Sequence, residues 1–279
     1  MKMTLKISLI GLAAGMLLMV MGTALGAKKH MYLENGSVRV SEQKEQRMIS
    51  ESITPFSNLD INIVLSDIEV ISTGTEYKVE HLNDGRFEWS MEGDTLKIEE
   101  KTKLGYNLNV DLSFLFQRRR ENKLKVYIPK NVELESLNIK NVSGDIDLTM
   151  VEAEKMTIDI VSGDLEANMI VVKECEARMI SGDIEMEAVV IQRLFVKNAS
   201  GDVEISGIVL DSEFSLISGD VELELSGRRE DYAFDINNKS GDVYLNGKRS
   251  HDLGSGLADS EKKVKMDILS GDISLSFKN

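Results

Sequence analysis

The sequence predicts an all-β fold, a single-stranded parallel β-solenoid of repeats about 19 residues long, preceded by one N-terminal transmembrane helix. Three observations support this prediction. A Ser-Gly-Asp triplet recurs at nearly constant spacing, apolar and polar residues alternate on both sides of it, and a long uncharged segment lies near the N-terminus. Together they predict stacked strands held at a membrane.

The N-terminal segment has the length and polarity of a membrane span. Lys2 and Lys6 precede Ile7–Ala27, a stretch of 21 residues without a charge. As a helix it would be about 31 Å long, which matches the hydrocarbon core of a bilayer. We therefore expect residues 1–27 to be an uncleaved single-pass anchor in the cell membrane, with the C-terminal domain outside. A cleaved signal peptide is the alternative, because triplets such as Ala24-Leu25-Gly26 could be cut, and the protein would then be secreted.

The rest of the chain divides by composition. Residues 28–52 are polar and charged, and we expect a juxtamembrane linker there. Residues 53–279 form the predicted β-strand-repeat domain, with degenerate repeats in 53–130 and regular repeats in 131–279. Among the degenerate repeats, Ile61, Ile63 and Leu65 alternate with other residues ahead of a Ser-Asp pair. Alternation of this kind is typical of a strand with one face buried.

The regular repeats contain the strongest signal. Ser-Gly-Asp followed by Ile, Leu or Val occurs seven times, with the serines at spacings of 19, 19, 19, 18, 22 and 30 residues. The serines are Ser143, Ser162, Ser181, Ser200, Ser218, Ser240 and Ser270. Positions six and four residues before each serine, and three and five residues after it, are apolar with few exceptions. This period of two predicts a strand on either side of each triplet.

The triplet itself predicts a tight corner between the two strands. Glycine tolerates the backbone dihedrals that a sharp corner needs, and Ser and Asp side chains bond nearby backbone amides. One repeat cannot bury its own apolar face, whereas stacked repeats bury continuous columns of side chains. A parallel solenoid is therefore the favoured architecture. An antiparallel meander with Ser-Gly-Asp at the hairpin turns is the alternative.

Composition excludes several classes of function. The net charge of −14 repels phosphate backbones and anionic lipid, which disfavours nucleic acid as a partner. The three histidines, His30, His81 and His251, do not cluster with the single cysteine, Cys175, which occupies an apolar column. The sequence contains no phosphate-binding loop, zinc spacing or nucleophile elbow. We therefore predict a protein that is not an enzyme and needs no cofactor.

The turn aspartates are candidate ligands for a cation. Stacked repeats would place neighbouring carboxylates about 4.8 Å apart, where they repel unless something compensates their charge. Hydrogen bonds from backbone amides in the turn are one compensation, and we expect this structural role. Bound Ca²⁺ is the alternative. Its candidate ligands are Asp145, Asp164, Asp183, Asp202 and Asp220, continued by Asp242 and Asp272.

Two segments are candidate interaction loops. The first joins an apolar triplet, which includes Phe114 and Phe116, to the arginines Arg118, Arg119 and Arg120, and could touch a membrane surface or a partner. A strand end followed by a solvated turn is the structural interpretation, and we favour it. The second is the insertion that lengthens one repeat to 30 residues, where Lys248, His251 and Lys262 could contact a ligand. Such insertions are as often without function.

Several stretches resemble the bacterial putative-adhesin β-strand-repeat family, a group of uncharacterised domains. They are the Ser-Gly-Asp repeats, the segment EGDTLKIEE and the segment LKVYIPKNVELESLNIKNVSGDI, and the N-terminal span is similar to that of membrane-anchored Gram-positive members. The resemblance implies a non-enzymatic, adhesin-like binding module at the cell surface, with an unknown protein, peptide or envelope ligand. It is equally compatible with a Lia-type sensor or regulator of cell-envelope stress that responds to cationic antimicrobial peptides.

Overall fold

A computed structural model of the chain describes residues 31–34, 37–40, 48–82, 85–101, 123–250, 260 and 262–278. The chain divides into two units. The described part of the first is an antiparallel hairpin of β1 (Met31–Glu34) and β2 (Ser37–Val40). None of the described helices has the length and apolar character required to cross a membrane. The predicted anchor, residues 1–27, lies outside the described residues.

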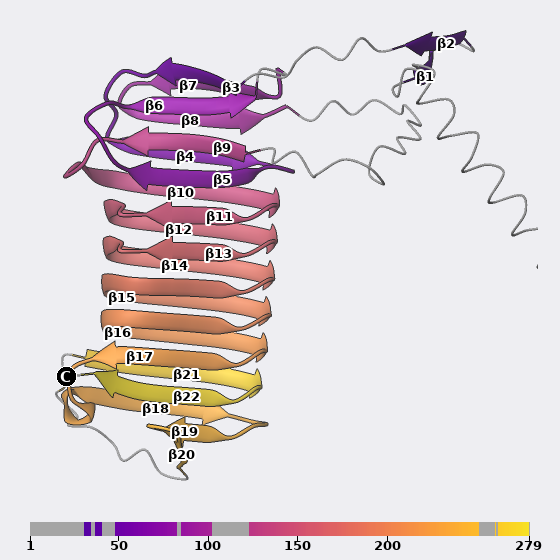
Figure 1. The fold of residues 1–279 in the computed structure, drawn as a ribbon. Coiled ribbons are helices and arrows are strands. Elements are labelled where there is room, and N and C mark those ends of the chain that lie inside the picture. The colour runs from indigo at the N-terminus through magenta and orange to yellow at the C-terminus, as the bar shows by residue number, and fades with distance from the viewer. Residues whose placement is uncertain are drawn as a thin grey trace, which may run out of the picture. The chain divides into compact units, whose positions relative to one another are not determined.

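The second unit is a stack of rungs, each made of two strands that meet at a corner (Figure 1). All of these strands belong to one hydrogen-bonded sheet, which bends at the corners. We call the face made by the first strands of the rungs the first sheet and the face made by the second strands the second sheet. The first sheet contains, in spatial order, β7 (Phe87–Glu92), β8 (Thr95–Glu100), β4 (Asn58–Ile63), β10 (Glu133–Ser143), β12 (Glu152–Ser162), β14 (Val171–Ser181), β15 (Ile184–Ser200), β16 (Val203–Ser218), β21 (Lys262–Ser270) and β18 (Tyr232–Asn238).

The second sheet continues each rung beyond the corner. It contains β3 (Met48–Ser52), β6 (Lys78–Leu82), β9 (Lys123–Ile128), β5 (Asp67–Ser72), β11 (Ile146–Thr149), β13 (Leu165–Asn168), the first parts of β15 and β16, β17 (Val221–Ser226), β22 (Ile273–Lys278), β19 (Val243–Leu245) and β20 (Lys248–Arg249). Strand β3 therefore forms within the segment expected to be a linker.

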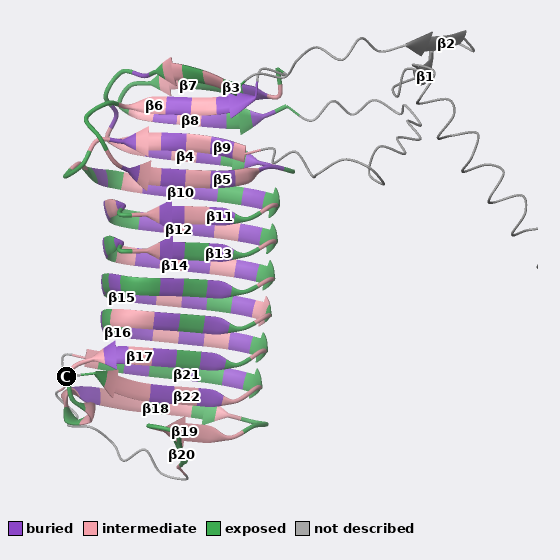
Figure 2. Ribbon diagram, in the orientation of Figure 1, coloured by how far each residue is buried: buried purple, intermediate pink, exposed green. Residues whose placement is uncertain are grey.

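The core lies between the two sheets and follows the predicted period of two. Ile139 and Ile158 are in register in neighbouring strands, and both are at most 1% exposed. Cys175 is buried in the same core, as its apolar column predicted. Figure 2 shows the resulting alternation of buried and exposed bands along each strand. The prediction of an all-β, solenoid-like fold is thus confirmed.

The Ser-Gly-Asp corners require glycine for two reasons. Gly182 has φ of +131°, in a region that side-chain-bearing residues rarely adopt. A Cβ atom there would lie 2.0 Å from the carbonyl oxygen of Gly163, the equivalent residue of the preceding rung. Each rung therefore packs its corner backbone directly on the next.

The opposite corner uses a different device. Met150, Met169 and Ala188 adopt left-handed backbone conformations, with φ of 55°, 54° and 52°. In the next rung Gly207 stands at this corner with φ of +140°, where the repeat is one residue shorter and the register shifts. Left-handed conformations cost side-chain-bearing residues about 1–2 kcal/mol. The stacking on either side of the corner compensates that cost.

The prediction of a purely parallel solenoid is wrong at both ends of the stack. Strands β7 and β8 form an antiparallel hairpin around Gly93, and β6 lies antiparallel to β3 and β9. At the other end, β20 folds back on β19. Between these ends every pairing is parallel. A terminal rung has no neighbour on one side, and a folded-back strand covers part of its open edge.

The order of the rungs also departs from the order of the chain. The rung formed by β21 and β22 lies between the rung of β16 and β17 and the rung of β18 and β19 (Figure 1). The last described strands of the chain therefore fill the penultimate position. After β17 the chain passes over one rung position to form β18 and β19, and it then returns to fill that position with β21 and β22. The serine spacings of 22 and 30 residues reflect these two steps, so the longest repeat is not simply a rung with an inserted loop.

Candidate interaction surface at the Ser-Gly-Asp corners

The turn aspartates form a continuous hydrogen-bonded ladder. In each rung the backbone N–H of the aspartate donates to a carboxylate oxygen of the aspartate in the neighbouring rung, at N···O distances of 2.7–3.1 Å. In spatial order the ladder runs through Asp67, Asp145, Asp164, Asp183, Asp202, Asp220, Asp272 and Asp242. Each carboxylate thus satisfies one amide of the next corner.

This ladder gives the aspartates the capping role that the sequence indicated. One carboxylate oxygen of each pair is committed to a backbone amide. Within the described ranges, no three His, Cys, Asp or Glu side chains converge to form a metal site. A carboxylate that accepts backbone N–H groups has its charged form stabilised without a cation.

A column of exposed aliphatic side chains runs beside the ladder. The residue immediately before each corner serine points outward, because the strand residue that precedes it is buried in the core. The large members of this column are 44–58% exposed. We call this set the aliphatic column, and it consists of Val142, Val161, Ile180, Ala199, Ile217 and Leu269, of which the small Ala199 is half-buried. Figure 2 shows these exposed strand ends along one edge of the stack.

A second row of carboxylates lies on the other side of the ladder. We call it the acidic column, and it consists of Asp147, Glu166, Glu185, Glu204 and Glu222. At its N-terminal end Lys123 bonds both Asp147 and Glu69. The other four carboxylates form no ion pair with any described residue. This face therefore presents unneutralised negative charge.

Mutual repulsion within the acidic column shows in its titration. The neighbouring carboxylate of Asp147 raises the pKa of Glu166 above its usual value of 4.5, with smaller contributions from desolvation and Glu185. Desolvation raises the pKa of Glu204, and the charges of Glu222 and Glu185 add to this. The raised values indicate a surface that would be stabilised by a cationic partner.

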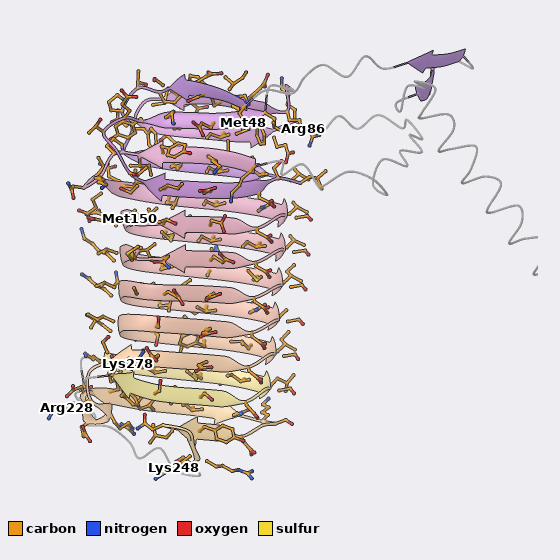
Figure 3. The ribbon with its side chains drawn as sticks, viewed as in Figure 1. Met48, Arg86, Met150, Arg228, Lys248 and Lys278 are labelled. Carbon is orange, nitrogen blue, oxygen red and sulfur yellow. The ribbon has the colours of Figure 1, made fainter. Side chains whose placement is uncertain are left out.

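The residues of the two candidate interaction loops do not lie together in the described structure. Lys248 lies in β20 and is exposed. Lys262 begins β21, where its Nζ lies 4.7 Å from the centre of the Tyr232 ring and donates to the carbonyl oxygen of Ser226, so it serves the fold. His251 and the Phe114, Phe116 and Arg118–Arg120 segment lie outside the described residues. Figure 3 shows Lys248, Arg228 and Lys278 near the C-terminal end of the stack.

Two open hollows elsewhere on the second unit lack the arrangement of side chains that a catalytic site requires. One, of about 480 Å³, lies at the N-terminal end and is lined by Glu51, His81 and Trp89 among others. The buried His81 has Nδ1 2.9 Å from the carbonyl oxygen of Leu82 and Nε2 3.8 Å from Glu51, and no hydrogen bond joins it to a described hydroxyl or thiol. The other, of about 320 Å³, lies against the outer face of β12–β16. Neither brings a nucleophile to a base.

The chain is similar to several solved structures of bacterial proteins. They include a putative cell adhesion protein from Clostridium sporogenes (9% identity, TM-score 0.43, covering 84% of this chain and 100% of the other) and a putative adhesin from Bacteroides fragilis (12%, 0.45, 84% and 98%). A third is a putative adhesin from Parabacteroides distasonis (12%, 0.47, 83% and 98%). These scores support no statement about ligands. No curated protein matches the chain.

A family model gives a more direct assignment. The model described as Toastrack DUF4097 matches residues 56–279, which include all of the regular rungs. The resemblance to an uncharacterised, adhesin-like family is confirmed at this level, and the chain belongs to the Toastrack DUF4097 family.

Proposed function

We propose that this protein is a non-enzymatic binding module on the outer face of a cell membrane, an adhesin-like domain that contacts its partner through the Ser-Gly-Asp edge. The N-terminal segment 1–27 holds it there as a single-pass anchor. If that segment is cleaved, the same module is secreted. The uncharged stretch Ile7–Ala27 supports the membrane part of the proposal.

The aliphatic column is the observation that carries the proposal. Single exposed aliphatic residues are normal on a protein surface, whereas a contiguous row of them marks an interaction site. From Val142 to Leu269 the column crosses six rungs, or five intervals of about 4.8 Å, which is about 24 Å in length. This length suits an extended segment of another chain.

The neighbouring charge specifies the chemistry of the partner. The aspartate ladder and the acidic column place carboxylates along the whole length of the aliphatic column. A second copy docked edge to edge would bring like charges together, and an anionic membrane surface would be repelled. The edge therefore fits a polypeptide that combines apolar side chains with Lys or Arg.

A regulatory role is the second candidate function. The unpaired carboxylates of the acidic column would attract cationic antimicrobial peptides, and a membrane-tethered domain that binds them could act as a Lia-type sensor or regulator of envelope stress. Deleting the protein distinguishes the two roles. Loss of cell attachment supports adhesion, whereas altered peptide susceptibility with normal attachment supports regulation.

Binding at the edge can be tested with a synthetic peptide of alternating Leu and Lys residues. The edge variant carries Val161→Ser, Ile180→Ser and Ile217→Ser. The control carries Val171→Ser, Val190→Ser and Ile208→Ser, which removes similarly exposed aliphatic residues from the opposite corner. We expect the edge variant to bind about tenfold more weakly, because each lost apolar contact contributes up to about 1 kcal/mol. Equal affinities of the edge variant, the control and the unsubstituted chain would contradict the proposal.

Topology is tested independently by protease treatment of intact cells. Release of peptides from residues 53–279, with residues 1–27 retained in the membrane, is the expected result for an anchored ectodomain. A chain in the medium that begins near Ala27 would indicate a cleaved signal peptide. Complete protection would overturn the extracellular assignment.

A further inference from the structure

The C-terminal rungs form a module whose strands pair with the stack through one rung only, apart from a hydrogen bond from the Tyr232 hydroxyl to the carbonyl oxygen of Ser226. Strand β18 pairs with β21 and β19 pairs with β22, while β21 and β22 alone pair with β16 and β17. We call β18, β19, β21 and β22 the C-terminal module. Within the described residues, the strands β18 and β19 have no pairing with the body of the stack, although they follow it directly in the chain.

The connection that makes this arrangement possible is short and irregular. Five residues, Gly227–Asp231, join β17 to β18 and include a 3₁₀ turn at Arg229–Asp231. They carry the chain past the β21–β22 position, a step of two rung intervals or about 10 Å. Six Cα–Cα steps reach about 20 Å when extended, so the connection is not stretched to its limit. We call this connection the hinge.

The module of another copy of the chain can make the same contacts with the stack as the chain's own module. These contacts consist of in-register parallel pairing, a buried contact of Phe214 with Met266, the ion pair of Lys265 with Glu213 at 2.8 Å, and the Asp272 N–H bond to Asp220 at 2.7 Å. Exchange of the module between two copies reproduces all of these contacts. Domain exchange of this kind therefore costs little beyond association itself.

The free end of the module exposes apolar surface that a dimer formed by exchange would bury. Its terminal rung leaves Phe234, Ile236, Val243 and Leu245 only partly buried, whereas their equivalents in inner rungs are at most 4% exposed. Strand β18 also has one unpaired edge, which is a site for association. Two copies placed end to end would cover both free ends.

We propose that two copies of this chain exchange their C-terminal modules and form an end-to-end dimer. Each module then lies on the β16–β17 rung of the partner, and the two β18–β19 rungs face one another at the centre. In this arrangement the hinge spans three rung intervals, about 14 Å, instead of two, which remains within its reach. Only one rung interface per copy has to open for the exchange.

Crosslinking between two variants of the full chain, each with one introduced cysteine, tests the exchange. One differently tagged chain carries Glu213→Cys in β16 and the other carries Lys265→Cys in β21, two adjacent positions across the exchanged interface. The chains are mixed, partly unfolded, refolded together at high concentration and treated with a short bismaleimide. The native Cys175 is buried and burial raises its pKa to about 12, so it does not compete.

We expect a crosslinked heterodimer from this mixture. A matched mixture with Thr157→Cys in place of Glu213→Cys should give none, because that residue occupies the same column three rungs away. A chain that carries both Glu213→Cys and Lys265→Cys, crosslinked before mixing, should lose the ability to dimerise. A dimer in solution without the crosslink would overturn module exchange in favour of simple end contact. Monomers throughout, with efficient crosslinking in the double variant, would overturn the proposal entirely.

Discussion

A carboxylate oxygen of Asp164 accepts the backbone N–H of Asp183 at 2.9 Å, one rung further along the stack. The same bond repeats through the ladder, so each rung fixes the corner of the next. A row of carboxylates about 4.8 Å apart would otherwise repel. The amide dipoles therefore compensate a charge that the repeat itself creates.

Two substitutions of one ladder aspartate distinguish how much its hydrogen bond and its charge each contribute to stability. Asp164→Asn keeps an acceptor for the Asp183 N–H and removes one of several neighbouring charges, so we expect unchanged or slightly increased stability. Asp164→Ala removes the acceptor and should cost about 1 kcal/mol. Urea denaturation of both variants measures the difference. If Asn is as damaging as Ala, the negative charge itself would be required.

Calcium provides the complementary test of the ladder. Because the carboxylates already accept backbone amides, we expect the melting temperature to be the same in millimolar Ca²⁺ and in chelator. A ligand that binds only the native state raises the melting temperature, and the rise grows with the logarithm of the ligand concentration above its Kd. A rise with Ca²⁺ that disappears in Asp183→Asn would instead assign the ladder to metal binding.

Much of the fold could be predicted because the repeat couples local and tertiary signals. The triplet Ser-Gly-Asp marks a corner, and alternation around it identifies the inward positions, so residues such as Ile139 and Leu165 were identifiable as core. The aliphatic column also had a signal. Alternation directs the residue before each corner serine outward, and an apolar residue there, such as Ile180, conflicts with the solvent it faces.

Other features had no comparable signal. The left-handed corner residues Met150 and Met169 are unusual choices for that conformation, since glycine or asparagine is the common one. The order of the last rungs was indicated only by the long spacing from Ser218 to Ser240, which leaves room for a two-rung step. Spacing alone cannot distinguish a loop from such a step, because both add residues to a repeat.

Stability should depend on pH through the acidic column. The pKa of Glu204 is raised in the folded state, so its favourable contribution is present below about pH 4.5 and is lost as pH rises through the folded-state value. We expect Glu204→Gln to be more stable than the unsubstituted chain at pH 7, by on the order of 0.5 kcal/mol, and indistinguishable at pH 3.5. Denaturation at both pH values, at low salt, measures this.

Glu80 provides a control of opposite sign. A hydrogen bond from Lys78 lowers the pKa of Glu80, so its contribution is present above about pH 4.5 and lost as pH falls through the folded-state value. Glu80→Gln should therefore be less stable at pH 7 and unchanged at low pH. If both variants shift in the same direction, a general effect of net charge rather than local pairing would explain the data.

The corner glycines should be the least replaceable residues of the repeat. Gly182→Ala would place Cβ against the Gly163 carbonyl oxygen, and we expect a loss of more than about 3 kcal/mol or failure to fold. Gly74 also has a positive φ, of 68°, but no atom lies within 4 Å of its Cβ position. Gly74→Ala should therefore lose only about 1–2 kcal/mol. Equal losses in chemical denaturation would assign the effect to dihedral strain and not to rung packing.

Glu100 caps the corner between β4 and β5 near the N-terminal end of the stack. Its carboxylate is buried and accepts the backbone N–H groups of Val64 and Leu65, both at 2.8 Å, and the hydroxyl of Ser66 at 2.9 Å. These donors lie in the corner between β4 and β5, beside the end of β8, which pairs with β4. Glu100→Ala would leave the buried Ser66 hydroxyl and two partly buried N–H groups without their acceptor, and we expect a loss of about 2–3 kcal/mol. The exposed neighbour Glu99→Ala should change the denaturation midpoint little, and similar losses in both variants would show that the carboxylate does not hold this end of the fold.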